Sequence, residues 1–213
     1  MHSYIADTEF AVTHLTAALV EDRAELVRLE EEQAAALSKE AHFDIAFMQR
    51  QMHPSANYWY GQLKEAQGQR NILDSEIAQI QARLLDKKFS LSALASALLQ
   101  IGKQGISVVR RNPASCPDGR TVCGVPLKWV IWAGRNQALH YEEPRMINDE
   151  TQGYLQRMGE TGGSALLLDA RAGESLALPV LEQLGWYSFA AYRDDMQRDR
   201  KSTRLNSSHS DRS

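Results

Sequence analysis

The chain has 213 residues, of which 43% are hydrophobic and 24% are charged, and its formal net charge is −3. This composition excludes disordered, collagen-like and membrane-spanning proteins, because apolar residues are plentiful yet no uninterrupted run approaches the roughly 18 that cross a bilayer. The start, MHSYIADTEF, lacks the order of a signal peptide, and only Cys116 and Cys123 are cysteines, so we expect a cytoplasmic protein without disulfides or membrane attachment.

The tail, 199–213, resembles translated sequencing-adapter DNA rather than protein that evolved to fold, since it begins DRKSTRLNSSH. We therefore treat it as an artefact and leave it out of the fold and the function. Without its four basic and two acidic residues the net charge becomes −5. That charge argues against a general nucleic-acid binder but not against a local basic site. We therefore also expect the chain to lack its natural C-terminus, and a fragment of a larger protein is one interpretation that stays open.

Periodic apolar residues predict long helices in the N-terminal half. From Ile5 to Ala36, apolar or small side chains recur every three or four residues, with acidic and basic residues between them. Asp22 and Gln33 interrupt this seam, which favours a helix packed in a bundle over a long free coiled coil. Pro54 marks a break between this helix and the next.

Two more helices follow in this interpretation. The second has the same spacing, shown by Leu63, Ala66, Leu73, Ile77, Ile80 and Leu84. Ser90 is a candidate N-cap for a third, which runs from Leu91 to about Val109. A turn-rich loop, NPASCPDGR, then covers 112–120.

Shorter elements complete the chain. Pro126 suits the first turn of a fourth helix that ends near Glu143. Residues 145–175 are mixed and rich in glycine, and 164–168 could form a short strand or fill the core. A short helix opens at Pro179, and Ser188 caps a last helix that reaches Met196.

We therefore predict an all-α fold, in which two long antiparallel N-terminal helices pack with a motif helix and a small C-terminal helical extension. The corresponding domains are a helical bundle at 1–150 and a helical extension at 151–198.

The fourth helix, PLKWVIWAGRNQALHYEEP, carries the residues with the most chemistry. One stripe holds apolar and small residues that permit close packing: Leu127, Ile131, Gly134, Ala138 and Tyr141. Another stripe is polar or aromatic: Lys128, Trp132, Asn136 and His140. Arg135 and His140 lie five residues apart, about 140° around a helix. They can meet at one ligand only if the arginine curls towards the histidine or a second protomer completes the site.

Arg135, Asn136 and His140 form the pattern RNxxxH, which resembles the R-x4-6-H motif of the HEPN superfamily. That resemblance implies an all-helical, dimeric protein of bacterial toxin–antitoxin or phage-defence systems. It also implies a metal-independent endoribonuclease without a cofactor, in which Arg135 and His140 are the defining site residues and Asn136 is the common polar residue after the arginine. RNA, a second copy and an antitoxin or toxin are then the expected partners.

The chemistry of such a site follows from the side chains. Histidine can act as a base near neutral pH, so His140 would deprotonate the 2′-OH of RNA. Arginine is a fixed cationic fork, so Arg135 would hold the phosphate while a cyclic phosphate end forms. Asn136 would orient the imidazole ring or hold a phosphate oxygen.

Other interpretations of the same residues stay open. Trp129 and Trp132 could stack on bases, but packing in the core or at a dimer interface is the preferred explanation. Cys116 and Cys123 lack the further ligands of a zinc site, so no metal is expected. The main rival to the ribonuclease is a non-catalytic helical interaction module, an antitoxin-like or coiled-coil partner with a degenerate motif.

Overall fold

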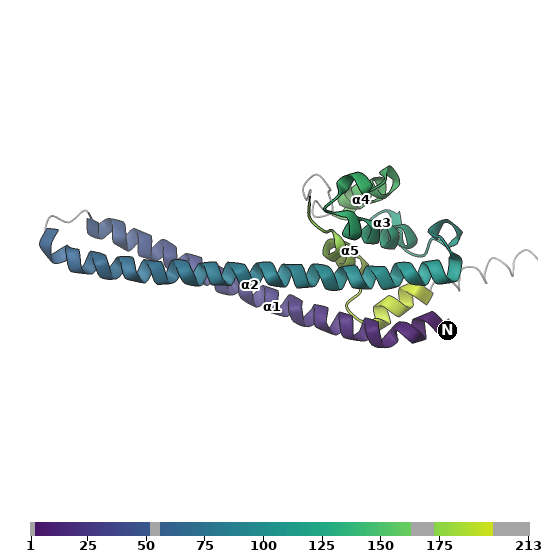
Figure 1. Ribbon diagram of the computed structural model, residues 1–213, viewed down its shortest axis with the longest axis horizontal. Helices are drawn as coiled ribbons and strands as arrows, with labels where there is room; N and C mark the ends of the chain where they lie inside the picture. The colour runs from purple at the N-terminus through teal and green to yellow at the C-terminus, as the bar shows by residue number, and fades with distance from the viewer. Residues whose placement is uncertain (1–2, 52–55, 163–172, 198–213) are drawn as a thin grey trace, which may run out of the picture. The chain divides into compact units, whose positions relative to one another are not determined.

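The computed structural model describes residues 3–51, 56–162 and 173–197. The predictions for 164–168 and for the tail at 199–213 lie outside these residues. Two long helices, α1 (Ser3–Gln51) and α2 (Ala56–Arg110), are packed antiparallel and contribute to two compact units (Figure 1). Asp22–Ser90 forms one, here the hairpin unit; the described residues before and after it form the core unit. The predicted all-α fold is therefore confirmed.

The hairpin unit is held together by a narrow apolar seam. Alanine and branched aliphatic side chains of both helices are buried along it: Leu29, Ala36, Ile77, Ile80 and Leu84, with Leu26 and Leu73 packed against them. Solvent-accessible ion pairs flank the seam, and in two of them Arg83 reaches across the hairpin, to Glu25 at 3.5 Å and to Glu32 at 3.6 Å. Exposed pairs of this kind contribute little each, so the seam supplies most of the stability of this unit.

Asp22, which interrupts the apolar pattern, has partners across the hairpin. Its carboxylate accepts hydrogen bonds from Lys87 Nζ at 2.8 Å and from Ser90 Oγ at 2.6 Å, and these hold its pKa below the ordinary value. Ser90 is therefore not an N-cap, and the second and third predicted helices are the single helix α2. The spacing alone predicted a boundary because a serine that caps a helix and one that bonds across it look alike in sequence.

In the core unit, residues 111–126 form a turn and a small hairpin that lead into α3 (Leu127–His140). A 3₁₀ turn, Pro113–Ser115, is capped by Asn112, whose side chain accepts a hydrogen bond from Ser115 N–H. Strand β1 (Thr121–Val122) then pairs antiparallel with β2 (Val125–Pro126). Both turn residues, Cys123 and Gly124, have positive φ, as a two-residue hairpin requires. This hairpin was not predicted from the sequence, where 112–120 was expected to be a loop followed by a helix from Pro126.

Helix α3 ends earlier than predicted, at His140 rather than near Glu143. The Glu143 N–H donates to the His140 carbonyl at 2.9 Å, an i to i+3 bond that replaces the next α-helical one. A 3₁₀ turn, Pro144–Met146, follows.

Helix α4 (Asp149–Gly162) is an element that the sequence analysis missed. The side chain of Asn148 accepts a hydrogen bond from Thr151 N–H at 2.9 Å and caps the helix, and Asp149 and Glu150 suit its positive end. Its glycines hid the pattern, but Leu155, Met158 and the small Gly159 are buried.

The last two helices match their predictions. Helix α5 (Ala177–Leu184) ends at Gly185, which has a φ of 69°. A further helix covers 189–197, and Ser188 Oγ accepts a hydrogen bond from Ala191 N–H, the predicted cap. Among the helices of the described residues, none has the length and apolar character needed to cross a membrane.

A partly buried ion pair ties this last helix to the segment before β1. The Arg120 guanidinium donates to both carboxylate oxygens of Asp195 at 2.8 Å and to the Leu184 carbonyl at 2.6 Å. Trp186 Nε1 donates to the same carboxylate at 2.9 Å. Asp195 is only 7% exposed, so these donors replace the water that would otherwise solvate its carboxylate.

We expect Asp195→Asn to lower the free energy of unfolding by about 2–4 kcal/mol, because one charge of a partly buried pair loses its partner. Urea denaturation followed by circular dichroism measures this change. The control is Asp194→Asn, since Asp194 is exposed and, among the described residues, pairs with its neighbour Arg193; we expect a change within about 0.5 kcal/mol. Equal stability of the two variants would contradict the role given to Asp195.

Candidate functional site

Helix α3, which carries the motif, lies in the middle of the core unit. Its apolar side is buried through Leu127, Val130, Ile131, Ala133 and Gly134. A Cβ at position 134 would come within 2.7 Å of Val180 and 3.3 Å of Leu99. The predicted close packing around Gly134 is therefore confirmed, since only glycine leaves room for α5 on one side and α2 on the other.

Arg135 and Asn136 are brought together, and both are half-buried. Arg135 Nε donates to Gln100 Oε1 of α2 at 2.7 Å, and Arg135 Nη1 contacts Asn136 Oδ1 at 3.3 Å. These contacts hold the guanidinium beside α2 and use part of its hydrogen-bonding capacity. The remaining donors are those that an anion would have to use.

His140 is not joined to the other two motif residues by a hydrogen bond in the part of the chain that the structure describes. It is the last residue of α3 and is half-buried. Because α3 is a continuous helix from Leu127, the five-residue spacing places Arg135 and His140 about 140° apart around its axis. A single protomer thus brings two of the three predicted site residues together and leaves the histidine on a different face.

Gln137, inside the motif but not among the predicted site residues, is the buried polar side chain of this helix. It is 2% exposed. Its Nε2 donates to the Glu174 carbonyl at 2.8 Å, and its Oε1 accepts from Leu176 N–H at 2.7 Å. The amide thereby fixes the backbone that leads into α5. Nothing in the sequence indicated this role, because the partners lie almost forty residues further along the chain.

The aromatic residues of α3 pack against other elements. Trp129 stacks on Tyr154 of α4, with ring centroids 5.1 Å apart and planes 15° apart. Trp132 lies under the Lys103 ammonium, which is 4.7 Å from the ring centroid. For both tryptophans the sequence favoured packing over stacking on RNA bases, and packing is what these two contacts show.

The cysteines are both free thiols. Cys116 is buried, and Cys123 Sγ donates to Gln183 Oε1 at 3.1 Å. Burial raises the pKa of the Cys123 thiol, which favours its protonated form. Among the described residues no group of three or more His, Cys, Asp or Glu is arranged to hold a metal ion.

Comparisons of the chain with protein-family models, with curated proteins and with solved structures found no match.

We expect Gln137→Leu to lower the free energy of unfolding by about 2–4 kcal/mol, since the substitution removes the acceptor of the buried Leu176 N–H and the amide that donates to the Glu174 carbonyl. Asn136→Ala is the matched control on the adjacent position, and we expect a change below about 1 kcal/mol. Thermal and urea unfolding measure both. A larger effect at Asn136 than at Gln137 would show that the half-buried Asn136, rather than the buried amide of Gln137, organises this region.

Proposed function

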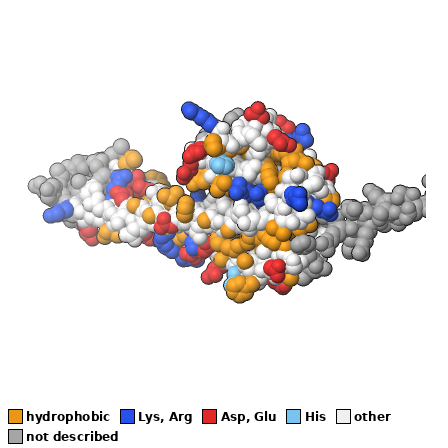
Figure 2. All heavy atoms as spheres, turned by 45° about the vertical axis from the view of Figure 1, so that its right-hand side comes forward, with side chains coloured by type: hydrophobic (Ala, Val, Ile, Leu, Met, Phe, Trp, Pro, Cys, Tyr) orange, Lys and Arg blue, Asp and Glu red, His pale blue; other side chains and the backbone are white. Residues whose placement is uncertain are grey.

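We propose that the chain is a helical interaction module, whose hairpin unit associates with a second copy of itself through α1. The observation that carries this proposal is a second row of apolar side chains on the exposed side of the hairpin. Figure 2 shows hydrophobic side chains among the charged ones on the surface of the protein.

Each helix of the hairpin unit carries such a row, which we call its outer stripe. Val27 and Ala34, for example, lie two positions before the seam residues Leu29 and Ala36, which is 200° around an α-helix. The outer stripe of α1 consists of Ala24, Val27, Ala34, Ala41, Ile45 and Met48. That of α2 consists of Ala78, Ala82, Leu85 and Phe89.

The larger members of both stripes are strongly exposed. Ile45 and Met48 of α1 are 57% and 61% exposed, and Leu85 and Phe89 of α2 are 70% and 72% exposed. The apolar residues recur in steps of three, four or seven residues over several turns, which is the heptad spacing by which one helix packs against another. Exposed apolar side chains that line up in this way are typical of a surface that packs against another helix. Exposed apolar residues that are scattered singly need no such explanation.

The α1 stripe is complementary to itself when two copies run antiparallel. If the pair is centred at residue 36, Val27 meets the partner's Ile45, and Ala24 meets the partner's Met48. Small residues, Ala34 and Ser38, then meet near the centre, where they allow close approach. A symmetric contact of this kind closes after two copies, whereas α1 against α2 of another copy would continue into an open chain.

One charged residue, Glu31, interrupts the α1 stripe, and in the centred pair it faces the partner's Ala41. A single polar residue at a core position lowers the stability of a coiled coil but fixes its register. Glu31 would thus disfavour shifted pairings in which two of these carboxylates approach each other.

We expect the wild-type chain to sediment with the mass of two copies, and Val27→Glu to sediment as one, because the substitution places a charge in two layers of the pair. Ile72→Glu is the control: Ile72 is 69% exposed and belongs to the hairpin unit, but it lies in neither outer stripe. Circular dichroism checks that all three proteins are helical. A monomeric wild type, or a dimeric Val27→Glu variant, would contradict the proposal.

RNA cleavage by Arg135 and His140, supplied by two protomers, is the second candidate function. The observation that favours it is the state of the His140 ring, which has no hydrogen-bond partner among the described residues and so keeps both nitrogens for a substrate. The contacts of Arg135 leave other guanidinium donors for a phosphate.

For this second function we expect the protein to cleave single-stranded RNA in the presence of a metal chelator, and His140→Ala to lower the rate by about 100-fold or more. Replacing one ribose by deoxyribose should protect the linkage that follows it, since the 2′-OH is the attacking group. His42→Ala, an exposed histidine of the hairpin unit, is the control. Cleavage that is equal in wild type and His140→Ala would show a contaminating nuclease and remove the proposal.

A further inference from the structure

A cavity of about 450 Å³ lies in the core unit, away from the motif residues. Four helices and a loop converge on it: the start of α1, the end of α2, the segment 116–119, the start of α3 and the helix at 189–197. Neither Arg135 nor His140 lines it. Its size falls within the range of small-molecule sites in proteins.

The walls of the cavity are largely apolar. The aliphatic and thioether side chains that line it come from each of the four helices: Ile5, Ile106, Val109, Leu127, Ile131 and Met196. Gly105 lets two of the other lining residues approach α2, because a Cβ there would be 2.8 Å from Met196 and 3.0 Å from Tyr4. The interior therefore suits a hydrocarbon chain.

Of the charged residues that line the cavity, three already have partners. Lys128 Nζ binds Asp118 at 2.8 Å and the Cys116 carbonyl at 2.7 Å. Asp195 is held by Arg120 and Trp186, as described above. The two carboxylates that line the cavity are thus each paired with a cation: Asp118 with Lys128, and Asp195 with Arg120.

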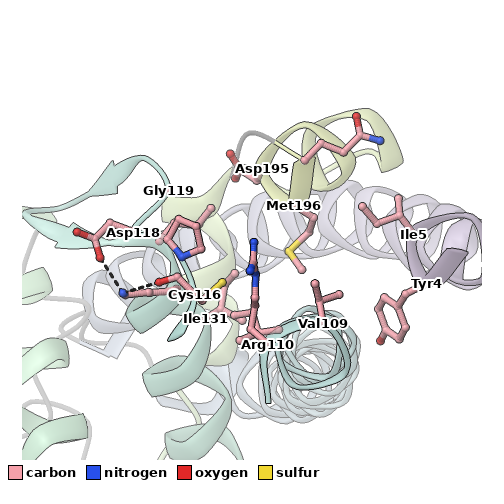
Figure 3. A pocket seen from close by; sticks show the side chains of 16 residues that line it. Tyr4, Ile5, Val109, Arg110, Cys116, Asp118, Gly119, Ile131, Asp195 and Met196 are labelled. Carbon is pink, nitrogen blue, oxygen red and sulfur yellow. Dashed lines mark hydrogen bonds and ion pairs between the residues drawn. The ribbon is translucent and has the colours of Figure 1, made fainter. Parts of the chain in front are cut away.

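Arg110 is the fourth charged residue, and its guanidinium has no hydrogen bond or ion pair within the described part of the chain. Figure 3 shows its side chain rising from the end of α2 into the space between the loop at Cys116 and the helix of Met196. A planar guanidinium can bind a carboxylate with two parallel hydrogen bonds. The cavity therefore combines an apolar interior with an exposed arginine that has no partner among the described residues.

We propose that this cavity binds an aliphatic carboxylate, with the carboxylate on Arg110 and the hydrocarbon chain among the apolar walls. The carboxylate and the hydrocarbon chain of the ligand contact different parts of the site. Their contributions to the binding affinity can therefore be measured separately. The proposal does not depend on self-association or on RNA cleavage.

The test is calorimetric titration of the full chain with decanoate, with decanol as the ligand that has the chain but not the charge, and with acetate as the ligand that has the charge but not the chain. We expect decanoate to bind once per chain, at least about tenfold more tightly than either of the other two. Arg110→Gln should weaken decanoate binding by about tenfold or more and leave decanol unchanged.

Arg111→Gln is the matched control, because Arg111 is the next residue, is exposed and does not line the cavity. Its decanoate affinity should stay within about twofold of wild type. Val109→Trp places a large ring at a partly exposed lining position, 40% exposed in the wild type, and should block decanoate and decanol alike. Circular dichroism establishes that each variant is folded. Decanoate binding that is absent, equal to that of decanol, or unchanged in Arg110→Gln would overturn the proposal.

Discussion

A hairpin of two long helices can bury only one side of each helix, and the organisation of the hairpin unit follows from this constraint. The seam that joins the helices is narrow, with alanine at position 36 and a hydrogen-bonded aspartate at position 22. The opposite side is left to solvent or to another molecule. In the hairpin unit that side carries Val27, Ile45 and Met48 rather than charges alone, so its sequence is that of a helix with two packing faces.

In the core unit, other elements of the same chain cover the side of each long helix that the pairing of α1 with α2 leaves open. There segments from the C-terminal part of the chain pack on α2 and on the start of α1, and α3 packs against α4 and α5. The covering depends on polar contacts as well as burial: Gln137 fixes the approach to α5, and the Arg120–Asp195 pair fixes the last helix. Side chains do not fill all the space between these elements. They leave a cavity, and Arg110 is one of the residues that line it.

Much of the fold could be predicted from the sequence, because apolar side chains that recur with the 3.6-residue period of an α-helix predict where the helices lie. The roles of Ser188 as a helix cap and of Gly185 as a helix end were also predictable, because each depends on residues close by in the sequence. Ser90 was misinterpreted because its partner, Asp22, is distant in the sequence. The same limit applies to the candidate site: the motif pattern selected Arg135, Asn136 and His140, but only the fold shows that Gln100 holds Arg135 and that Gln137 is structural. The cavity left no signal in the sequence, since five separate segments form it.

The antiparallel pairing of α1 is the claim that can be tested most directly, by measuring distances between spin labels across the pair. The labels are attached singly at Lys39→Cys or Arg23→Cys in a protein whose Cys116 and Cys123 are replaced by serine. A pair centred at residue 36 predicts axial offsets of about 9 Å between the labels at position 39 and about 39 Å at position 23, from the rise per residue of an α-helix. Equal distances at the two positions, or no coupling between labels at either, would contradict the account.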